Sequence, residues 1–182
     1  MHFIIMKIIY KKEEAVELLL QQKLVEIFQN HSEWGARALG NRSLLFDPRN
    51  KNGKQIVNTI KKRENYRPFA GVVMHEHAKL WFDMGDIKES PFMLYSIPVK
   101  EDRKKLIPSI VHVDGTCRIQ TVTKEQNLHL YELLESFAEK TNVPILLNTS
   151  LNLAGKPLIS DITWAKKLIE RSSLKHLYFP GT

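Results

Sequence analysis

Arginine and lysine residues concentrate in one part of the chain, between Glu33 and Arg67. This stretch has nine basic residues against three acidic ones, so its formal charge is +6, close to the +7 of the whole chain. The basic residues are Arg37, Arg42, Arg49, Lys51, Lys54, Lys61, Lys62, Arg63 and Arg67. A guanidinium group presents a fixed fork of donors that matches two phosphate or carboxylate oxygens. The arginines are spaced by glycine, alanine and proline, which predicts a loop-built pocket for a polyanion; a solvated basic face is the alternative.

Segment 33–43 has the composition of a ligand-binding loop. Gly35 and Gly40 allow the backbone to approach a ligand and to adopt unusual dihedral angles. Glu33 is a candidate for orienting an arginine or holding a metal. The other candidate ligand contacts in this segment are Arg37, Asn41, Arg42 and Ser43. The alternative is a glycine-rich turn held together by salt bridges.

A second basic group consists of Lys61, Arg63 and Arg67. In extended backbone, residues two apart share a face, so Lys61 and Arg63 are expected to point at one anion. Pro68 disfavours the helical conformation for Arg67 and predicts that Arg67 lies in a loop. A charged helix end is the alternative interpretation.

Two further groups follow nearer the C-terminus. His112 and Asp114 lie two residues apart, a spacing that allows them to share a proton or a cation, while Arg118 and Gln120 are expected on one side of a strand. An ordinary turn and strand is the alternative.

A polar segment follows the apolar strand expected at 143–147, and α/β sheets bind ligands at such strand ends. Its candidate binding residues are Asn148, Thr149, Ser150 and Asn152.

Other sequence features limit the possible functions. The chain of 182 residues is expected to form one domain, 1–182, and its pI near 9.4 favours anionic partners. One cysteine, Cys117, excludes an internal disulfide and fits the cytoplasm. No apolar run approaches the roughly 20 residues of a membrane helix. His75 and His77 are not predicted to form a metal pair, because they would point to different faces of a short helix, and no residue is assigned as a metal ligand.

Apolar residues alternate between strand and helix spacing along the chain. Strands are expected over residues 3–9, 24–28, 42–46, 71–74, 91–99, 117–122, 143–147 and 177–179. Helices are expected over residues 12–22, 52–62, 75–82, 127–140 and 160–172, the last one capped by Ser160. In the helix at 127–140, one face carries Leu130, Leu133, Leu134, Phe137 and Ala138. This alternation predicts an α/β fold with a mixed sheet.

Five segments of the chain, in the order in which they occur, resemble motifs of the C-terminal domain of the NodU/CmcH-type O-carbamoyltransferases. The matching motifs occupy residues 33–43, 47–49, 60–70, 112–122 and 144–152, and the resemblance covers about residues 12–180. It implies a YrdC-like fold, a twisted mixed sheet flanked by helices, related to the threonylcarbamoyl-adenylate synthases. The pair Lys61-x-Arg63 and the pair Ser150-x-Asn152 are also similar to pairs in the wider YrdC-like group.

The resemblance implies that the chain binds ATP and carbamoyl phosphate, with Mg²⁺ as the expected cofactor. Carbamate from carbamoyl phosphate would attack the α-phosphate of ATP to give carbamoyl-adenylate, whose carbamoyl group then passes to an acceptor hydroxyl of unknown identity. In the family, that second step belongs to a separate ASKHA-type (O-sialoglycoprotease-like) domain. Since the chain begins near the start of the YrdC-like part, it is expected to be a separate adenylate-forming half, a fragment or a relic.

The resemblance also assigns roles to individual residues. The expected phosphate ligands are Arg37, Arg42, Lys61, Arg63 and Arg67, with Ser150 and Asn152 on the nucleotide. His112, Asp114, Arg118 and Gln120 are expected to orient the carbamoyl end or Mg²⁺. The residues expected to be catalytic are Lys61, Arg63, Arg67, His112 and Asp114.

Two rival functions stay open at the level of sequence. One is a threonylcarbamoyl-adenylate synthase-like enzyme of tRNA modification, and the other is a YrdC-like module that binds RNA without catalysis. The compact, loop-borne charge with few interleaved aromatic residues argues against nucleic acid as a partner.

Overall fold

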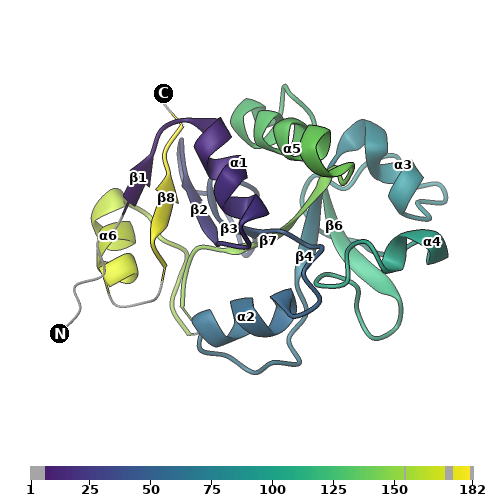
Figure 1. Ribbon diagram of the computed structural model, residues 1–182, viewed down its shortest axis with the longest axis horizontal. Helices are drawn as coiled ribbons and strands as arrows, with labels where there is room; N and C mark the ends of the chain where they lie inside the picture. Colours follow the sequence, from purple (N-terminus) through teal and green to yellow (C-terminus); the bar gives the residue numbers. More distant parts are fainter. Residues whose placement is uncertain (1–6, 154, 171–173, 181–182) are drawn as a thin grey trace.

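One mixed sheet organises the part of the chain that the computed structural model describes, which comprises residues 7–153, 155–170 and 174–180. Across these residues the sheet has eight strands in the order β1-β8-β2-β3-β7-β4-β6-β5 (Figure 1). The strands are β1 (Lys7–Ile9), β2 (Val25–Phe28), β3 (Arg42–Phe46), β4 (Ala70–Met74), β5 (Ser96–Pro98), β6 (Thr116–Val122), β7 (Ile145–Ser150) and β8 (His176–Tyr178). The expected α/β class with a mixed sheet is confirmed.

Strand β7 lies between β3 and β4 and pairs antiparallel with both of them. Strand β4 then pairs parallel with β6. The register sets Asn148 opposite Ala70, and Ala70 opposite Arg118. Opposed residues on neighbouring strands project to the same face of a sheet. The pairing therefore brings residues from three separate sequence motifs into one row.

Helices cover the sheet on both sides in Figure 1. They are α1 (Lys12–Leu20), α2 (Gly53–Ile60), the 3₁₀ turn η1 (His75–His77), α3 (Ala78–Trp81), α4 (Glu101–Lys104), α5 (Leu128–Thr141) and α6 (Ile162–Glu170). Helices α1 and α5 contact each other above the sheet in this view, and α2 lies below it. None of the described helices has the length and apolar character needed to cross a membrane.

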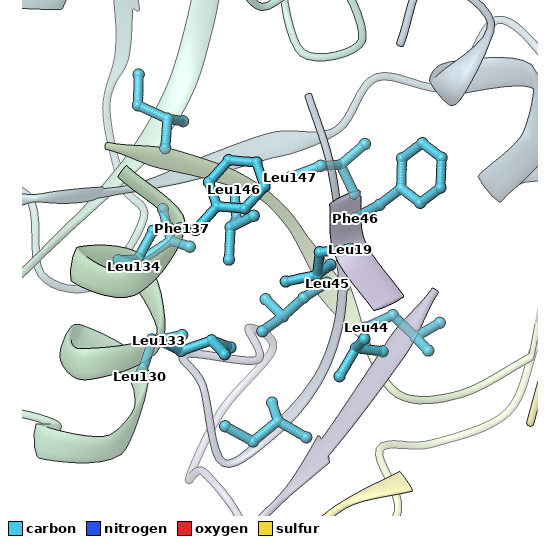
Figure 2. Close-up of a cluster of buried hydrophobic side chains, with 14 of the residues drawn as sticks. Leu19, Leu44, Leu45, Phe46, Leu130, Leu133, Leu134, Phe137, Leu146 and Leu147 are labelled. Atoms are coloured by element: carbon cyan, nitrogen blue, oxygen red, sulfur yellow. The ribbon is translucent and has the colours of Figure 1, made fainter. Parts of the chain in front are cut away.

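The main hydrophobic core lies between α5, α1 and the central strands. Figure 2 shows Leu130, Leu133, Leu134 and Phe137 of α5 gathered near side chains of β3 and β7. All four side chains are fully buried, as the helical spacing predicts, and Ala138 is partly buried against the same cluster. The side chain of Asn127 caps the helix by accepting a hydrogen bond from Leu130 N at 3.1 Å.

Several expected elements differ in length from those observed. The strand expected at 91–99 is confined to β5, since Met93 has a φ of 58° that a strand does not allow. The helix expected at 75–82 divides into η1 and the single turn α3. Helix α4 was not predicted; it is only four residues long, too short to show a helical period.

Two other expectations on helix and strand ends were wrong. Asp161, not Ser160, caps α6, because its Oδ1 accepts from Trp164 N at 3.0 Å. Strand β7 continues to Ser150, because ladder hydrogen bonds from β3 reach that residue. Asn148, Thr149 and Ser150 are therefore the last strand residues rather than the loop that follows. Of the strand expected at 3–9, residues 1–6 lie outside the described part.

A buried carboxyl group lies within the sheet. Glu26 of β2 is fully buried; its Oε2 accepts from His176 N at 2.8 Å, and its Oε1 has no partner. Burial raises the pKa of Glu26 from 4.5 to about 8, and the hydrogen bond from His176 opposes that rise. The folded protein therefore binds the proton more tightly than the unfolded chain. Its contribution to stability is complete below pH 4.5 and is lost as the pH rises through 8.

Glu26→Gln should therefore flatten the pH dependence of stability. Between pH 5 and 7 the unfolding free energy of the parent should fall relative to that of the variant, by up to about 1.4 kcal/mol per pH unit. Urea titrations of both proteins at pH 5, 6 and 7 measure this difference. A difference that stays constant across these pH values would contradict the assignment of a neutral Glu26.

Candidate anion-binding site

A cavity of about 240 Å³ is lined by residues from the end of β7, from segment 33–43 and from the stretch that follows α2. Five cationic side chains line it: Arg37, Lys61, Arg63, Arg67 and Arg118. The remaining described lining residues are Ala36, Ala38, Pro68, Phe69, Ala70, Met93, Asn148, Thr149, Ser150, Asn152, Leu153 and Gly155. No carboxylate is among them. Such a lining has the chemistry of a site for a multiply charged anion.

Lys61 is the most deeply placed of these cations, at 2% exposure. Its Nζ donates to Ser150 O at 2.5 Å, Asn152 O at 3.1 Å and Asn152 Oδ1 at 2.9 Å, with Ser150 Oγ at 3.4 Å. Burial, followed by repulsion from Arg63 and Arg67, lowers the pKa of Lys61 from 10.5 to about 7. The ammonium group is therefore tied to the end of β7 and is close to losing its proton at neutral pH.

The sequence predicts extended backbone from Lys61 to Arg63, but the structure shows a turn there. Lys61 continues the turn of α2 at φ −73°, and Lys62 then adopts a left-handed φ of 53°. Arg63 nevertheless reaches the same cavity. Its Nε donates to Asn58 Oδ1 at 2.6 Å, and its guanidinium lies 4.5 Å from the centre of the Phe69 ring. Burial, and next the charge of Arg67, lower the pKa of Arg63 to about 10.

Arg67 and Arg118 are held less tightly than Lys61. Arg67 is about half exposed and lies 3.8 Å from Glu64, which is a weak surface ion pair. Arg118 projects from β6, and its Nε is buried without a hydrogen-bond partner. Burial, and next the charge of Arg37, lower the pKa of Arg118. Both guanidinium groups therefore have donor capacity that a bound anion can use.

Segment 33–43 is organised by the Glu33 carboxylate. Its Oε1 accepts from Leu39 N at 2.7 Å, Asn41 N at 2.8 Å and Arg42 N at 3.3 Å. Gly40 has a φ of 109°, and an added Cβ would lie 2.5 Å from Leu130 of α5. Gly40 therefore permits close contact with a helix rather than with a ligand. The same segment brings Arg37 and Ala38 to the cavity.

Arg42 does not line the described cavity but holds neighbouring backbone segments together. Its Nη1 donates to Gln29 O and to Asn41 O at 2.9 Å, and its Nη2 donates to Asn30 O at 2.9 Å. The guanidinium lies 3.7 Å from the centre of the Phe28 ring. These contacts join the turn after β2 to segment 33–43. Ser43 accepts from Gly40 N at 3.0 Å, within the same segment.

Two neutral amides lie beneath the cations. Asn148 Nδ2 donates to Ala38 O at 3.2 Å and to Gln120 Oε1 at 2.9 Å. Gln120 Nε2 in turn donates to Leu39 O at 2.9 Å. Asn148 is 1% exposed and lines the cavity, and its Oδ1 has no partner. Gln120 is buried behind it and is not a lining residue.

His112 and Asp114 are not among the described lining residues, although His112 contacts the backbone of the lining residue Phe69. His112 Nε2 is 3.0 Å from Phe69 O, and its Nδ1 is 3.2 Å from Thr116 Oγ1. Asp114 Oδ1 accepts from Thr116 N at 3.0 Å and from its hydroxyl at 2.8 Å. The two side chains meet at Thr116 rather than at the anion site. Their arrangement shapes the turn that precedes β6.

The structure thus divides the residues expected at a site into two sets. The set that lines the cavity is Arg37, Lys61, Arg63, Arg67, Arg118, Asn148, Thr149, Ser150 and Asn152. The set outside the lining is Glu33, Asn41, Arg42, Ser43, His112, Asp114 and Gln120. Met93 and the Arg63 partner Asn58 were missed, because neither belongs to a motif that marks them in the sequence.

The donor set does not fit a protein-held magnesium ion. Mg²⁺ binds oxygen ligands and is usually held by one or two carboxylates. The described lining has cations and neutral amides instead, and no group of three or more His, Cys, Asp or Glu in the described residues could hold a metal ion.

A second cavity of about 620 Å³ adjoins the first one through Asn152 and Leu153. Its described lining is more apolar and includes Pro157, Leu158, Ile159 and Trp164, with Lys156 and Lys167 also present. A molecule with a charged end and a flat apolar end could therefore extend from one cavity into the other.

The comparisons with known proteins agree with this picture. A family model described as Carbamoyltransferase C-terminus matches residues 16–182. Nodulation protein NolNO of Sinorhizobium fredii is 43% identical over 150 residues, which are 81% of this chain and 22% of that protein. Nodulation protein NolO of Bradyrhizobium diazoefficiens is 42% identical over 151 residues, 82% of this chain and 28% of that protein. The chain spans about a quarter of the length of these relatives.

Solved structures match over nearly the whole chain. Full-length HypF in the phosphate- and nucleotide-bound form has a TM-score of 0.67 at 18% identity, over 96% of this chain and 25% of that one. P. abyssi Sua5 complexed with L-threonine has a TM-score of 0.64 at 15% identity, over 97% and 50%. These likenesses confirm the expected YrdC-like fold.

Arg67→Ala should weaken anion binding while the fold stays intact. The side chain is half exposed with one weak ion pair, so its loss removes a donor fork without opening the core. The affinity for pyrophosphate, measured by calorimetry, should fall at least about tenfold, as for the loss of a charge-assisted hydrogen bond. Arg67→Lys should recover little of it. Arg103→Ala, which removes a cation outside the lining, is the matched control; an equal loss in that variant would contradict the assignment.

Sulfate binding should depend on the protonation of Lys61. Sulfate has no titration of its own near neutral pH, and Lys61 carries its charge below about pH 7. The affinity for sulfate should therefore decrease on the order of tenfold from pH 6 to 8.5, and binding at pH 8 should take up a proton. Calorimetry in buffers of different ionisation enthalpy measures both quantities. Proton uptake that persists in a folded Lys61→Met variant would assign it to another group.

Proposed function

Since this chain belongs to the family described as Carbamoyltransferase C-terminus, we propose that its anion-binding cavity forms carbamoyl-adenylate from ATP and carbamoyl phosphate. The observation that carries this proposal is the lining of five cations without a carboxylate. ATP and carbamoyl phosphate together bring about six negative charges, which require such a concentration of Arg and Lys. Full-length HypF, a structural neighbour, is described as phosphate- and nucleotide-bound.

The proposed reaction needs positioning and charge stabilisation more than proton transfer. Water cleaves carbamoyl phosphate to carbamate and inorganic phosphate. A carbamate oxygen then bonds to the α-phosphorus of ATP, and the bond from that phosphorus to the bridging oxygen breaks to release pyrophosphate. Carbamate attacks as an anion, so no general base is needed at this step. A lining with neither His nor carboxylate among the described residues suits that chemistry.

The positions of the lining cations suggest roles for them in this reaction. Arg63, Arg67 and Arg118 bring guanidinium forks to the cavity and are assigned to the phosphoryl oxygens. Lys61 adds a charge at the end of β7, where it is held by Ser150 and Asn152. An anion beside Lys61 favours its charged form, so substrate binding reinforces the ammonium.

The adjoining cavity offers a place for the nucleoside. Its apolar walls include Leu158, Ile159 and the exposed Trp164. A purine base is flat and largely apolar, and it gains from burial against such side chains. The phosphates would then point through the junction at Asn152 and Leu153 toward the cations.

Transfer to the acceptor hydroxyl is assigned to a part of the protein beyond this cavity. The curated relatives are about four times as long as the matched region, which leaves room for a further domain such as the ASKHA-type one. A carbamoyl-adenylate is labile in water, so a closed passage between the two sites is expected.

Exchange of label between pyrophosphate and ATP tests the proposal. Exchange should require carbamate, supplied either by fresh carbamoyl phosphate or by ammonium carbamate, and should not occur with threonine plus bicarbonate. Arg118→Ala should reduce the exchange rate on the order of a hundredfold, while Arg103→Ala should leave it near the parent value.

The two carbamate sources separate two steps. Exchange with ammonium carbamate alone would place the cleavage of carbamoyl phosphate on another domain and keep the proposed adenylation. Exchange that occurs only with threonine plus bicarbonate would instead assign the threonylcarbamoyl-adenylate reaction to this chain. No exchange with either source would overturn the proposed function.

A further inference from the structure

We propose that Asn148 recognises the amino group of the carbamoyl moiety and thereby selects carbamoyl over acetyl and similar groups. The proposal rests on the proposed function and names the group that one residue of the same cavity recognises. It depends on a hydrogen-bond acceptor that the fold leaves unused. In a cavity built for anions, an unused acceptor needs its own explanation, because a bound anion offers it no donor.

The unused acceptor is the side-chain oxygen of Asn148. This residue is 1% exposed, and its Oδ1 is buried without a partner. Leaving a buried polar atom unpaired is unfavourable, so a ligand donor placed there gains from it. Two neighbouring side-chain oxygens are engaged, since Ser150 Oγ donates to Asn152 Oδ1 at 2.6 Å and Lys61 donates to that same Asn152 oxygen.

The orientation of the Asn148 amide is fixed by backbone carbonyl groups. Its Nδ2 faces Ala38 O, and a rotated amide would place two acceptor oxygens against each other there. Gln120 is fixed in the same way, because its Nε2 faces Leu39 O. Gln120 Oε1 then accepts the second Asn148 Nδ2 hydrogen. Asn148 Oδ1 is therefore held as an acceptor, and Gln120 is the residue that positions it.

A complementary donor lies in the same row of the sheet. Arg118 and Asn148 flank Ala70 on adjacent strands, and Arg118 Nε is a buried donor without a partner. Two strand spacings separate their backbones by roughly 10 Å. Ala70, Asn148 and Arg118 all line the cavity, so a ligand there would lie against the whole row. A carbamoyl group that accepts from one side and donates to the other would bridge these two side chains through hydrogen bonds of about 2.9 Å.

The carbamoyl group matches this pair of unused atoms. Its amino group donates hydrogen bonds and its carbonyl oxygen accepts them. An acetyl group has nearly the same size and shape but presents a methyl group to Asn148, which would leave Oδ1 unpaired. Bicarbonate presents a hydroxyl or a charged oxygen instead of an amino group. The discrimination against acetyl therefore comes from one acceptor that the amino group pairs and the methyl group leaves unpaired.

A matched pair of stable ligands tests this inference by binding alone. Phosphonoacetamide carries a terminal amide, and acetonylphosphonate has a methyl group in place of the amino group. The parent protein should bind the amide at least about tenfold more tightly by calorimetry. Asn148→Leu should reduce that ratio to near one, because it removes the acceptor. Asn65→Leu, an exposed asparagine outside the cavity, should keep the parent ratio.

A second variant covers the case in which Asn148→Leu does not fold. Gln120→Leu removes the partner that fixes the Asn148 amide, and should lower the ratio several-fold. Circular dichroism reports whether each variant is folded. Equal affinities for the two ligands in the parent, or an unchanged ratio in a folded Asn148→Leu or Gln120→Leu variant, would overturn the inference. Because no turnover is measured, failure of pyrophosphate exchange would instead bear on the proposed function.

Discussion

Mutual repulsion among five cationic side chains is the constraint on which the structure of the site depends. At about 4 Å, two like charges near a protein surface repel each other by roughly 1 to 4 kcal/mol. No lining carboxylate offsets this repulsion in the part of the chain described. Neutral oxygen atoms do so instead: Ser150 and Asn152 surround the ammonium of Lys61, and Asn58 accepts from Arg63. A bound polyanion then meets cations among which Arg67 has one weak surface ion pair with Glu64, and no carboxylate lines the described cavity.

Two carboxylates outside the described lining, those of Glu33 and Asp47, organise neighbouring loops. Glu33 gathers three N–H groups of its own segment, and buried Asp47 accepts from Arg49 and Gln22. Each carboxylate fixes a loop that carries or adjoins cationic residues. This division of roles leaves the cavity positive while its walls stay ordered. It also explains why Arg42, five residues after Arg37, has a structural position, since Arg42 bonds to the carbonyl groups of the adjoining turn.

Segment 33–43 also fixes two neutral amides, those of Asn148 in the cavity lining and Gln120 behind it. Glu33 holds Leu39 N, and the carbonyl groups of Ala38 and Leu39 set the orientations of Asn148 and Gln120. A carboxylate outside the described lining thus helps to fix the orientation of the Asn148 amide. In the proposed function, the cations would bind the phosphates and the fixed amide would select the carbamoyl group.

The sequence by itself determined the α/β class, the helix at 127–140 and the pocket cations Arg37, Lys61, Arg63 and Arg67. Local patterns suffice for these features, because the apolar period and the clustering of arginine beside glycine and proline are properties of neighbouring residues.

Only the tertiary structure decided which polar residues face the cavity. Arg37 and Arg42 share one motif, yet one lines the cavity and the other is buried against Phe28. Asn148, Ala70 and Arg118 form a row only because β7, β4 and β6 pair in that register. The unpaired oxygen of Asn148 depends on Ala38, which is 110 residues away in the chain. Contacts at such separations are set by strand pairing and packing, which no local pattern of residues encodes.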